Sequence, residues 1–300
     1  MNKPRRAPRR RIDGVLLLDK PPGMSSNAAL QKARWLFNAE KGGHTGTLDP
    51  MATGLLPLCL GEATKFASEL LDADKTYEAT VRLGQTTDTA DAEGQVLESR
   101  PVDVNDAQLA TAIARFVGDI EQVPPMYSAL KRDGKPLYEY ARAGIELERQ
   151  ARSVTIHSIE QLGRDEGDIR LRVHCSKGTY IRTLAADLGE ALGCGAHLAA
   201  LRRTRIGDLD IADALPLATL ESMEGPVRDA CLQPADALLS RLPIVHLDAA
   251  IAARFLHGQT VSQAGAPGRC RVYGGNRFIG LGEITPEGWL KPLRLLATAA

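Results

Sequence analysis

The chain has 300 residues, of which 44% are hydrophobic, and its 37 Lys and Arg balance its 37 Asp and Glu. This composition is typical of a globular protein with one large domain, or with a large and a small one. No apolar run approaches the ~18 residues of a membrane span, and the N-terminus lacks the apolar core of a secretion signal, so we expect no membrane association and a cytoplasmic location.

The first eleven residues, MNKPRRAPRRR, carry six positive charges, two prolines and no acid. A segment so polar and so broken by proline does not pack or form a helix, so we expect residues 1–11 to be a disordered basic arm. Three more arginines lie in LRRTRI, residues 201–206. Local basic patches indicate a nucleic-acid partner, although charge runs taken alone are more often solvated surface. Charge therefore supports such a partner without deciding it.

The first predicted elements lead into a glycine-rich run. GVLLLDK, residues 14–20, predicts a short buried strand, and PPGMSS then leads into a helix that begins near Ser25 or Ser26. Next comes KGGHTGTLDPMATGLLPLCLGEATKF, in which Asp49 lies among Gly, Thr and apolar residues. Because Pro50 disfavours a helical conformation of the residue before it, we expect Asp49 in an extended loop.

The later elements have clear periods. TYEATVRLG, residues 76–84, and DIRLRVHC, residues 168–175, alternate polar and apolar residues, which is typical of half-buried strands. One helix is expected near 105–117, and another follows SKGT with an apolar stripe from Ile181. Such strands favour a mixed, mainly antiparallel sheet with one exposed face. We therefore expect an α+β fold in which helices flank this sheet.

Two boundaries divide the chain. QVPPMYSALKRDGKPLYEYARAG opens a Pro- and Tyr-rich basic segment, about 122–152, which we expect to reach out from the sheet as an insertion. Near Pro243 the chain changes to a short helix and then VYGGNRFIGLGEI, two short strands around a turn. Residues 12–242 should thus form the main domain, and 243–300 a small β-barrel whose core rests partly on it.

Asp49 is the leading candidate for a catalytic group, although an Asp before Pro by itself more often stabilises a turn. A carboxylate in a dry, glycine-rich pocket needs a cation from elsewhere, and Arg182 in SKGTYIRT, at a strand-to-helix junction, is the best candidate. Such a partner is expected to lower the pKa of Asp49 and to keep it ionised as a nucleophile.

The aromatic residues give a weaker signal. Tyr77 on the apolar face of its strand, and Tyr180 beside Arg182, are by themselves more typical of core positions. The chain is only 4% aromatic, however, and its tyrosines fall beside lysines and arginines, as stacking platforms for single-stranded or flipped bases do. His44 is equally well a loop histidine or a residue that packs into a looped-out nucleotide, and Leu201 by itself is typical of core.

Nothing in the spacing of cysteines or histidines indicates a metal site. The cysteines, five in number, form no CxxC pair, so we expect reduced thiols rather than a disulfide framework. The six histidines show no HxxxH or HExxH spacing, so we expect no metal. The sequence also lacks a Walker loop and a GxGxxG strand–helix unit, which agrees with a reaction that uses no cofactor.

Five motifs in a fixed order carry a resemblance to a known family. They are GGHTGTLDPMATGLLPLCLGEATKF, KTYEATVRLG, QVPPMYSALKRDGKPLYEYARAG, SKGTYIRTLAADLG and AHLAALRRTRIG. From about residue 12 to the C-terminus the chain closely resembles the bacterial TruB-type tRNA pseudouridine-55 synthases. The resemblance implies an isomerase that converts one uridine of the tRNA T loop to pseudouridine without a cofactor. It also implies that 12–242 form the catalytic domain, with an RNA-binding insertion, and that 243–300 form a PUA-like RNA-binding barrel.

The resemblance also assigns roles to single residues. Asp49 matches the family's catalytic aspartate, and Tyr77 matches the tyrosine that stacks on the target base. Positions that line the pocket, pair with the aspartate or hold the flipped uridine are matched by Tyr180, Arg182, Leu201 and His44. Lys65 matches a basic residue near the substrate backbone.

The implied partner is the T arm and loop of tRNA, bound by a monomer with no obligatory protein partner. One alternative is a guide-RNA-dependent pseudouridine synthase, which shares the catalytic run, although the bacterial form GGHTGTLDPMATGLLPL is intact here. The other is a non-catalytic RNA-binding or RNA-folding module in which Asp49 is structural. Within the catalytic reading, Asp49 could attack C1′, add to C6 or remove the 2′ proton. Tyr77 is a candidate C5 base, but a phenol with a pKa of about 10 is a poor one.

Overall fold

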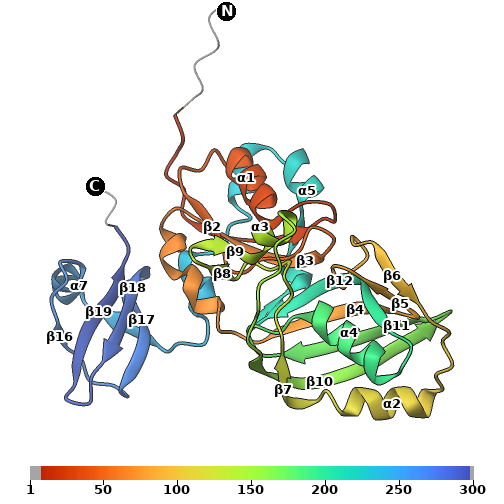
Figure 1. Ribbon diagram of the computed structural model, residues 1–300. Helices are drawn as coiled ribbons and strands as arrows, with labels where there is room; N and C mark the ends of the chain where they lie inside the picture. Colours follow the sequence, from red (N-terminus) through yellow and green to blue (C-terminus); the bar gives the residue numbers. More distant parts are fainter. Residues whose placement is uncertain (1–7, 298–300) are drawn as a thin grey trace, which may run out of the picture.

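A ten-stranded sheet is the centre of the structure, a computed structural model that describes residues 8–297 (Figure 1). Two of the described pairings, β1 with β14 and β3 with β12, are parallel and the others in this sheet are antiparallel, so the predicted mixed, mainly antiparallel sheet is confirmed. In order across the sheet, the strands are β14 (Leu215–Pro216), β1 (Gly14–Lys20), β3 (Thr53–Leu60), β12 (Ala196–Ile206), β4 (Lys75–Leu83), β11 (Asp168–Cys175), β10 (Arg152–Asp165) and β7 (Gly118–Gln122), with β2 (Gly42–His44) beside β3 and β13 (Leu209–Asp210) beside β12.

Helices and two small strand pairs surround this sheet, which confirms the α+β class. The helices are α1 (Ser26–Leu36), α2 (Asp106–Ala114), α3 (Leu137–Arg142), α4 (Ile181–Ala191), α5 (Leu217–Ser222) and α6 (Gly225–Asp229), with 3₁₀ helices η1 (Gly61–Leu70), η2 (Ile211–Asp213) and η3 (Ala235–Leu239). The strand pairs are β5 (Gln85–Thr87) with β6 (Val96–Ser99), and β8 (Lys131–Arg132) with β9 (Lys135–Pro136). No helix between residues 8 and 297 is long and apolar enough to cross a membrane.

Local signals explain how the elements next to the cavity begin. α1 starts after Ser25, whose side chain accepts a hydrogen bond from the Ala28 N–H, as an N-cap does. In β4, residues from Tyr77 to Leu83 on one face are buried while those between them are partly or fully exposed, which confirms the predicted alternation. α4 begins directly after Tyr180 and buries its apolar stripe against the sheet.

The predicted insertion is a hairpin followed by a short helix. At the tip of the hairpin, Asp133 and Gly134 both have positive φ, 52° and 80°, as a tight two-residue hairpin turn requires. The β8–β9 hairpin and α3 lie in front of the sheet in Figure 1. Arg142 at the end of α3 lies 5.3 Å from the centre of the Tyr138 ring.

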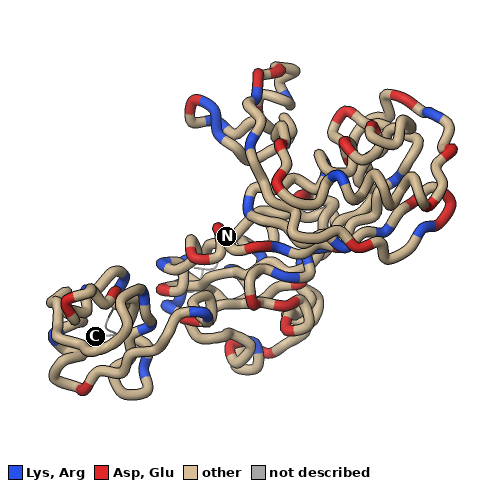
Figure 2. Tube along the Cα trace, turned by 90° about the horizontal axis from the view of Figure 1, so that it is seen from below, with Lys and Arg blue, Asp and Glu red and all other residues tan. Residues whose placement is uncertain are grey.

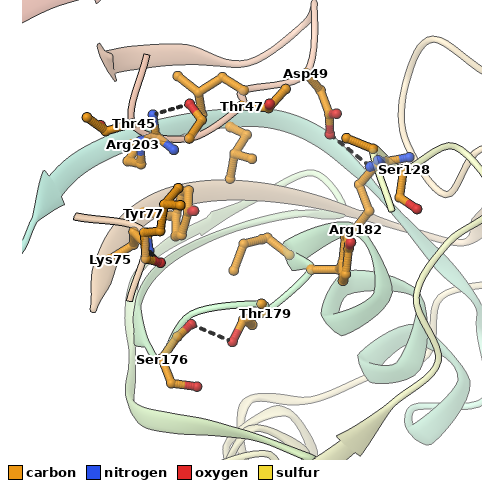
Figure 3. A pocket seen from close by; sticks show the side chains of 18 residues that line it. Thr45, Thr47, Asp49, Lys75, Tyr77, Ser128, Ser176, Thr179, Arg182 and Arg203 are labelled. Carbon is orange, nitrogen blue, oxygen red and sulfur yellow. Dashed lines mark hydrogen bonds and ion pairs between the residues drawn. The ribbon is translucent and has the colours of Figure 1, made fainter. Parts of the chain in front are cut away.

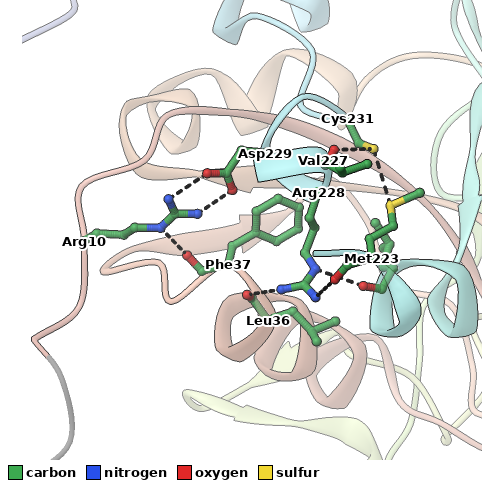
Figure 4. Close-up of polar contacts among 9 residues, drawn as sticks. Arg10, Leu36, Phe37, Met223, Val227, Arg228, Asp229 and Cys231 are labelled. Atoms are coloured by element: carbon green, nitrogen blue, oxygen red, sulfur yellow. Dashed lines mark hydrogen bonds and ion pairs between the residues drawn. The ribbon is translucent and has the colours of Figure 1, made fainter. Parts of the chain in front are cut away.

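The prediction that residues 1–11 form a disordered arm is wrong for Arg10. Its Nε donates to the Phe37 carbonyl at 2.8 Å, and its Nη1 donates to Oδ2 of Asp229 at 2.7 Å (Figure 4). Carbonyls at a helix C-terminus lack partners within the helix, so a guanidinium beside the end of α1 is favourable. Residues 1–7 of the predicted arm lie outside the described residues.

The arginines of LRRTRI do not form the basic patch that the sequence suggested. Arg202 pairs with Asp19 at 2.7 Å and Arg205 pairs with Asp210 at 3.4 Å, while Arg203 is buried. Figure 2 shows basic and acidic residues interspersed along the whole described trace. The sequence alone shows these positive charges, but it does not show which acidic residues the fold brings beside them.

The C-terminal domain is a curled five-stranded sheet with one helix, α7 (Ala249–Leu256). Its strands in order are β15 (Ile244–Leu247), β17 (Gly268–Gly274), β18 (Arg277–Ile284), β19 (Trp289–Leu295) and β16 (Val261–Ser262). Phe278 of β18 packs on Phe66 of η1 with ring centres 5.5 Å apart, within a buried apolar cluster that also contains Leu238 and Leu281. The expectation that this domain's core rests partly on the large domain is confirmed.

Candidate active site

A cavity of about 230 Å³ opens where the loop of residues 45–49, β4, β12 and the start of α4 meet (Figure 3). The predicted site residues that line it are Asp49, Tyr77, Tyr180, Arg182 and Leu201. Other lining residues, which the sequence did not single out, include Thr45, Lys75, Ser128, Ser176 and Arg203. The sheet thus brings together segments that lie more than 150 residues apart in the chain.

The predicted ion pair between Asp49 and Arg182 is present. Arg182 Nε lies 3.0 Å from Oδ2 of Asp49, and Figure 3 shows the two side chains pointing toward one another. The side chain of Arg182 is 5% exposed and that of Asp49 is 34% exposed. The carboxylate therefore faces the cavity, and the guanidinium lies behind it in the protein.

The guanidinium of Arg182 is itself fixed by three further groups. Its Nη1 donates to the Thr89 carbonyl at 3.3 Å and its Nη2 donates to the Tyr127 carbonyl at 2.6 Å. Its Nε also lies 3.6 Å from Oδ2 of the buried Asp91. One planar cation therefore joins the Asp49 loop, the turn between β5 and β6, and the base of the insertion.

The prediction that Arg182 lowers the pKa of Asp49 is wrong in its net direction. Burial raises the pKa of Asp49, because a carboxylate that loses hydration is costly to ionise, and this effect exceeds the lowering by Arg182. The charge of Asp91 raises the pKa further, and Lys20 lowers it slightly. Asp49 is thus a more basic carboxylate than a free one, as suits a nucleophile or base.

Lys20 fixes the loop that carries Asp49. It is fully buried at the end of β1, and its Nζ donates to the carbonyls of Pro21, Met24 and Pro50 at 2.9, 2.6 and 3.2 Å. Burial lowers the pKa of Lys20 to about 8, and the nearby charges of Glu93 and Asp49 oppose this shift. The bond to the Pro50 carbonyl therefore ties the residue that follows Asp49 to the end of β1 and the segment after it.

Tyr77 contributes an apolar ring to the cavity. Its register partner in β12 is Arg203, which donates from Nε to the Leu55 carbonyl at 2.9 Å and from Nη2 to the Gly46 carbonyl at 3.4 Å. Burial raises the pKa of Tyr77, and the adjacent Arg203 offsets this only in part. The hydroxyl is therefore neutral near pH 7 and a poor proton acceptor.

Tyr180 is held at the junction between β11 and α4 by a buried amide. Gln122, 2% exposed, accepts a hydrogen bond from the Tyr180 N–H at 3.0 Å and donates to the Tyr180 carbonyl at 3.3 Å. This clamp ties β7 to the first turn of α4, which carries Arg182. Leu201, 9% exposed, completes the wall from β12.

The other two predicted residues do not line the cavity. His44 lies at the end of β2, next to the lining residues Thr45 and Gly46, and burial lowers its pKa so that it is neutral. Lys65 lies in η1, where its Nζ donates to Glu62 at 2.6 Å and to the Leu295 carbonyl of the C-terminal domain at 2.7 Å. The expected role of Lys65 near a substrate backbone stays a prediction.

Models of one protein family match nearly the whole chain. The N-terminal domain of TruB family pseudouridylate synthases matches residues 34–181, a tRNA pseudouridylate synthase B C-terminal domain matches 182–240, and a TruB pseudouridine synthase II C-terminal domain matches 243–296. The chain belongs to the TruB family of pseudouridine synthases. It is therefore an RNA-modifying isomerase by family, and the Asp49 cavity lies within the parts that these models cover.

Curated TruB-family relatives resemble the chain over nearly its full length. The tRNA pseudouridine synthase B of Aromatoleum aromaticum is 61% identical over 97% of this chain and 95% of its own. That of Dechloromonas aromatica is 60% identical over 97% of each chain. Among solved structures, a chain of a Cbf5–Nop10–Gar1 complex is 28% identical, with a TM-score of 0.68, over 91% of this chain and 78% of its own. A chain of an H/ACA RNP bound to a substrate RNA containing 2′-deoxyuridine is 25% identical, with a TM-score of 0.70, over 95% of this chain and 85% of its own.

Sequence reasoning did not identify the buried residues that hold the other residues of this TruB-family site in position. Asp91, Lys20, Gln122 and Arg203 are all buried and charged or polar. The sequence offered one signal for such residues, which is a polar residue on the buried face of a strand. Arg203, opposite Tyr77, is an example. Asp91 and Gln122 had none, because their partners lie far away in the chain.

Proposed function

We propose that this TruB-family protein converts uridine 55 in the T loop of tRNA to pseudouridine, with Asp49 as the nucleophile. The observation that carries the proposal is the ion pair of Asp49 with the buried Arg182 at the wall of a cavity. The reaction breaks the C1′–N1 bond of uridine and joins C1′ to C5 of the same base. C5 then loses its proton to solvent and N1 takes one up, so the product is an isomer of uridine. A nucleotide inside a stacked loop cannot reach a recessed carboxylate, so the uridine is flipped out of its stack first.

The chemistry asks for an ionised carboxylate and a surface that holds a detached base. Arg182 keeps Asp49 oriented and charged, and the raised pKa makes the carboxylate a better nucleophile than an exposed one. Tyr77 supplies a stacking face for the uracil, while Leu201 and Tyr180 bound the space in which the base turns.

The substrate assignment rests on the names of the relatives and on an exposed basic hairpin. Relatives about 60% identical over nearly the full chain are named tRNA pseudouridine synthase B. We infer that the chain acts on the T arm as a monomer. The exposed basic hairpin tip, Lys131, Arg132 and Lys135, is suited to phosphate contacts that position an RNA without reading its bases.

The test is tritium release from an unmodified tRNA transcript labelled at C5 of its uridines. The wild-type protein should release label from position 55 without any guide RNA, and a transcript with cytidine at 55 should give none. Asp49→Asn should abolish release and leave tRNA affinity within a few-fold, since phosphate contacts dominate binding. Asp106→Asn, at an exposed ion pair with Arg164, is the matched control and should behave as wild type.

Each alternative predicts a different result. A guide-RNA-dependent synthase would be inactive on the bare transcript and active only with an added guide. A non-catalytic RNA-binding module would bind tRNA but release no label, and Asp49→Asn would then match wild type in every measurement. Either result would refute the proposal.

A further inference from the structure

Two histidines and an aspartate converge on the exposed face of the large sheet. His157 of β10, His174 of β11 and Asp74, which precedes β4, each place one possible ligand atom within 4.8 Å of the other two. His157 Nε2 lies 3.3 Å from Oδ2 of Asp74, and the two imidazole rings have centres 4.7 Å apart at 44°. The sequence-based expectation of no metal considered only local spacing, whereas these three residues come from three separate segments.

An irregularity in the sheet brings His157 to this position. The β10–β11 register shifts between Ile156, opposite Cys175, and Ser158, opposite His174, so His157 is the extra residue of a bulge. Bulges re-aim a side chain and increase the local twist. His174 in turn lies opposite Thr76 of β4, two residues after Asp74, which brings the aspartate to the same face.

We propose that Asp74, His157 and His174 bind a divalent transition-metal ion such as Zn²⁺. Two imidazole nitrogens and one carboxylate oxygen form a ligand set of known zinc sites, with bonds of about 2.0–2.2 Å. Ligand atoms of a tetrahedral ion then lie about 3.3 Å apart, which is the separation already present between His157 and Asp74. His174 offers a ring nitrogen within 4.8 Å of the other two ligand atoms, and its ring is only partly buried, so a shift of this side chain would complete the set.

The surroundings leave room for the ion and for a further ligand. Asp74 and His174 line a groove of about 690 Å³, so water or a small anion can occupy the open position. The cations that line this groove are already paired with acids, which are Glu78 and Glu160 for Arg172, Asp210 for Arg205 and Asp208 for Arg241. Their charges therefore repel an incoming dication only weakly.

The site lies on the face of the sheet opposite the catalytic cavity. Asp74 directly precedes Lys75, and His174 is followed after one residue by Ser176, and both Lys75 and Ser176 line the cavity. A bound ion would therefore join the start of β4, the bulge of β10 and the last residues of β11 without touching the substrate. Metal binding at this site does not depend on the proposed tRNA reaction.

The test titrates Co²⁺ and then Zn²⁺ into the full-length protein after chelation, by absorbance and by calorimetry. We expect one ion per chain, a cobalt spectrum without thiolate bands, and a higher melting temperature with zinc. Even an outer-shell change costs about 10–100-fold in metal affinity, so loss of a ligand in His157→Ala, His174→Ala or the near-isosteric Asp74→Asn should weaken binding at least about tenfold. His257→Ala, an exposed histidine of the C-terminal domain, is the control and should bind as wild type.

Several results would overturn the proposal. They are wild-type affinity in Asp74→Asn and in both histidine variants, a cobalt spectrum with thiolate bands, or weaker binding in His257→Ala. Circular dichroism of each variant separates loss of the ligand from loss of the fold. Tritium release should be equal with and without chelator, which keeps this test apart from that of the proposed function.

Discussion

Replacing Arg182 by lysine keeps the charge beside Asp49 but removes the shape that holds it. The guanidinium reaches Asp49 at 3.0 Å and the carbonyls of Thr89 and Tyr127 at 3.3 and 2.6 Å, from a position that is 4% exposed. An ammonium is a point donor and cannot span groups from three segments. We therefore expect Arg182→Lys to lose at least two charge-assisted hydrogen bonds.

Each such bond contributes about 1.5–3 kcal/mol, so the loss is about 3–6 kcal/mol, which equals a factor of about 10²–10⁴ if it falls on the transition state. The measurement is the single-turnover rate of tritium release with enzyme in excess, at a temperature below the melting point of each variant. The matched control is Arg82→Lys, whose guanidinium forms two 2.8 Å bonds to Asp168 at a half-exposed surface. A surface pair contributes only about 0–1 kcal/mol, so the control rate should stay within a few-fold.

An Arg182→Lys rate equal to that of the control would refute the orienting role. A lower melting temperature with an unchanged rate would leave Arg182 a purely structural residue. Only a fall in rate in a folded variant supports the orienting role.

Four further outcomes are expected. Because burial raises the pKa of folded Asp49, the group favours folding most below the pKa of free aspartate, and this contribution is lost as pH rises through the folded pKa. Asp49→Asn should therefore lose less stability than the wild type in denaturant titrations as pH rises above the pKa of free aspartate. The acid limb of the wild-type rate should also lie above that pKa. Tyr77→Phe should flip and hold the base almost normally while Tyr77→Leu loses about 1–3 kcal/mol of stacking free energy, and a Phe variant as inactive as Leu would give the hydroxyl a chemical role. Gln122→Leu removes the acceptor of the Tyr180 N–H, while the Tyr180 carbonyl still accepts from the Leu184 N–H. This change should lower the single-turnover rate more than the tRNA affinity, and equal losses in both would contradict a positioning role. Deleting residues 2–9 keeps the docked Arg10 and should flatten the slope of log K against log salt by about 0.7–0.9 for each phosphate that the shortened protein no longer neutralises. The rate at saturating tRNA should not change. Identical slopes for the two proteins would show that residues 2–9 do not contribute to tRNA binding.

Local signals predicted the elements well, because each is set by a few neighbouring residues. The Ser25 cap and the alternation around Tyr77 act within a few positions, and both are present in the structure. Asp49 and Arg182 were paired correctly because a buried carboxylate requires a cation and few candidates had a suitable context. The sign of the Asp49 pKa shift was wrong because it depends on how deeply the carboxylate is buried and on the charge of Asp91.

Contacts between distant segments explain what the sequence could not predict. Gln122 and Tyr180 are 58 residues apart, and no local pattern indicates that one clamps the other. The convergence of His157 on His174 depends on a bulge, and one residue more or less in β10 would separate them. The docking of Arg10 likewise requires Asp229, 219 residues away.

The packing of Phe278 on Phe66 has a consequence for any RNA that touches both domains. One apolar cluster spans the two domains, so swivelling of the C-terminal sheet on its linker would expose apolar surface and is opposed. The distance between that sheet and the Asp49 cavity then changes little on binding. Any conformational change that a complex requires would fall mainly on the RNA. A folded RNA whose length matches this distance would contact both sites without strain. An unfolded or misfolded RNA would contact one site only, so the arrangement of the two domains would select RNAs by their tertiary structure.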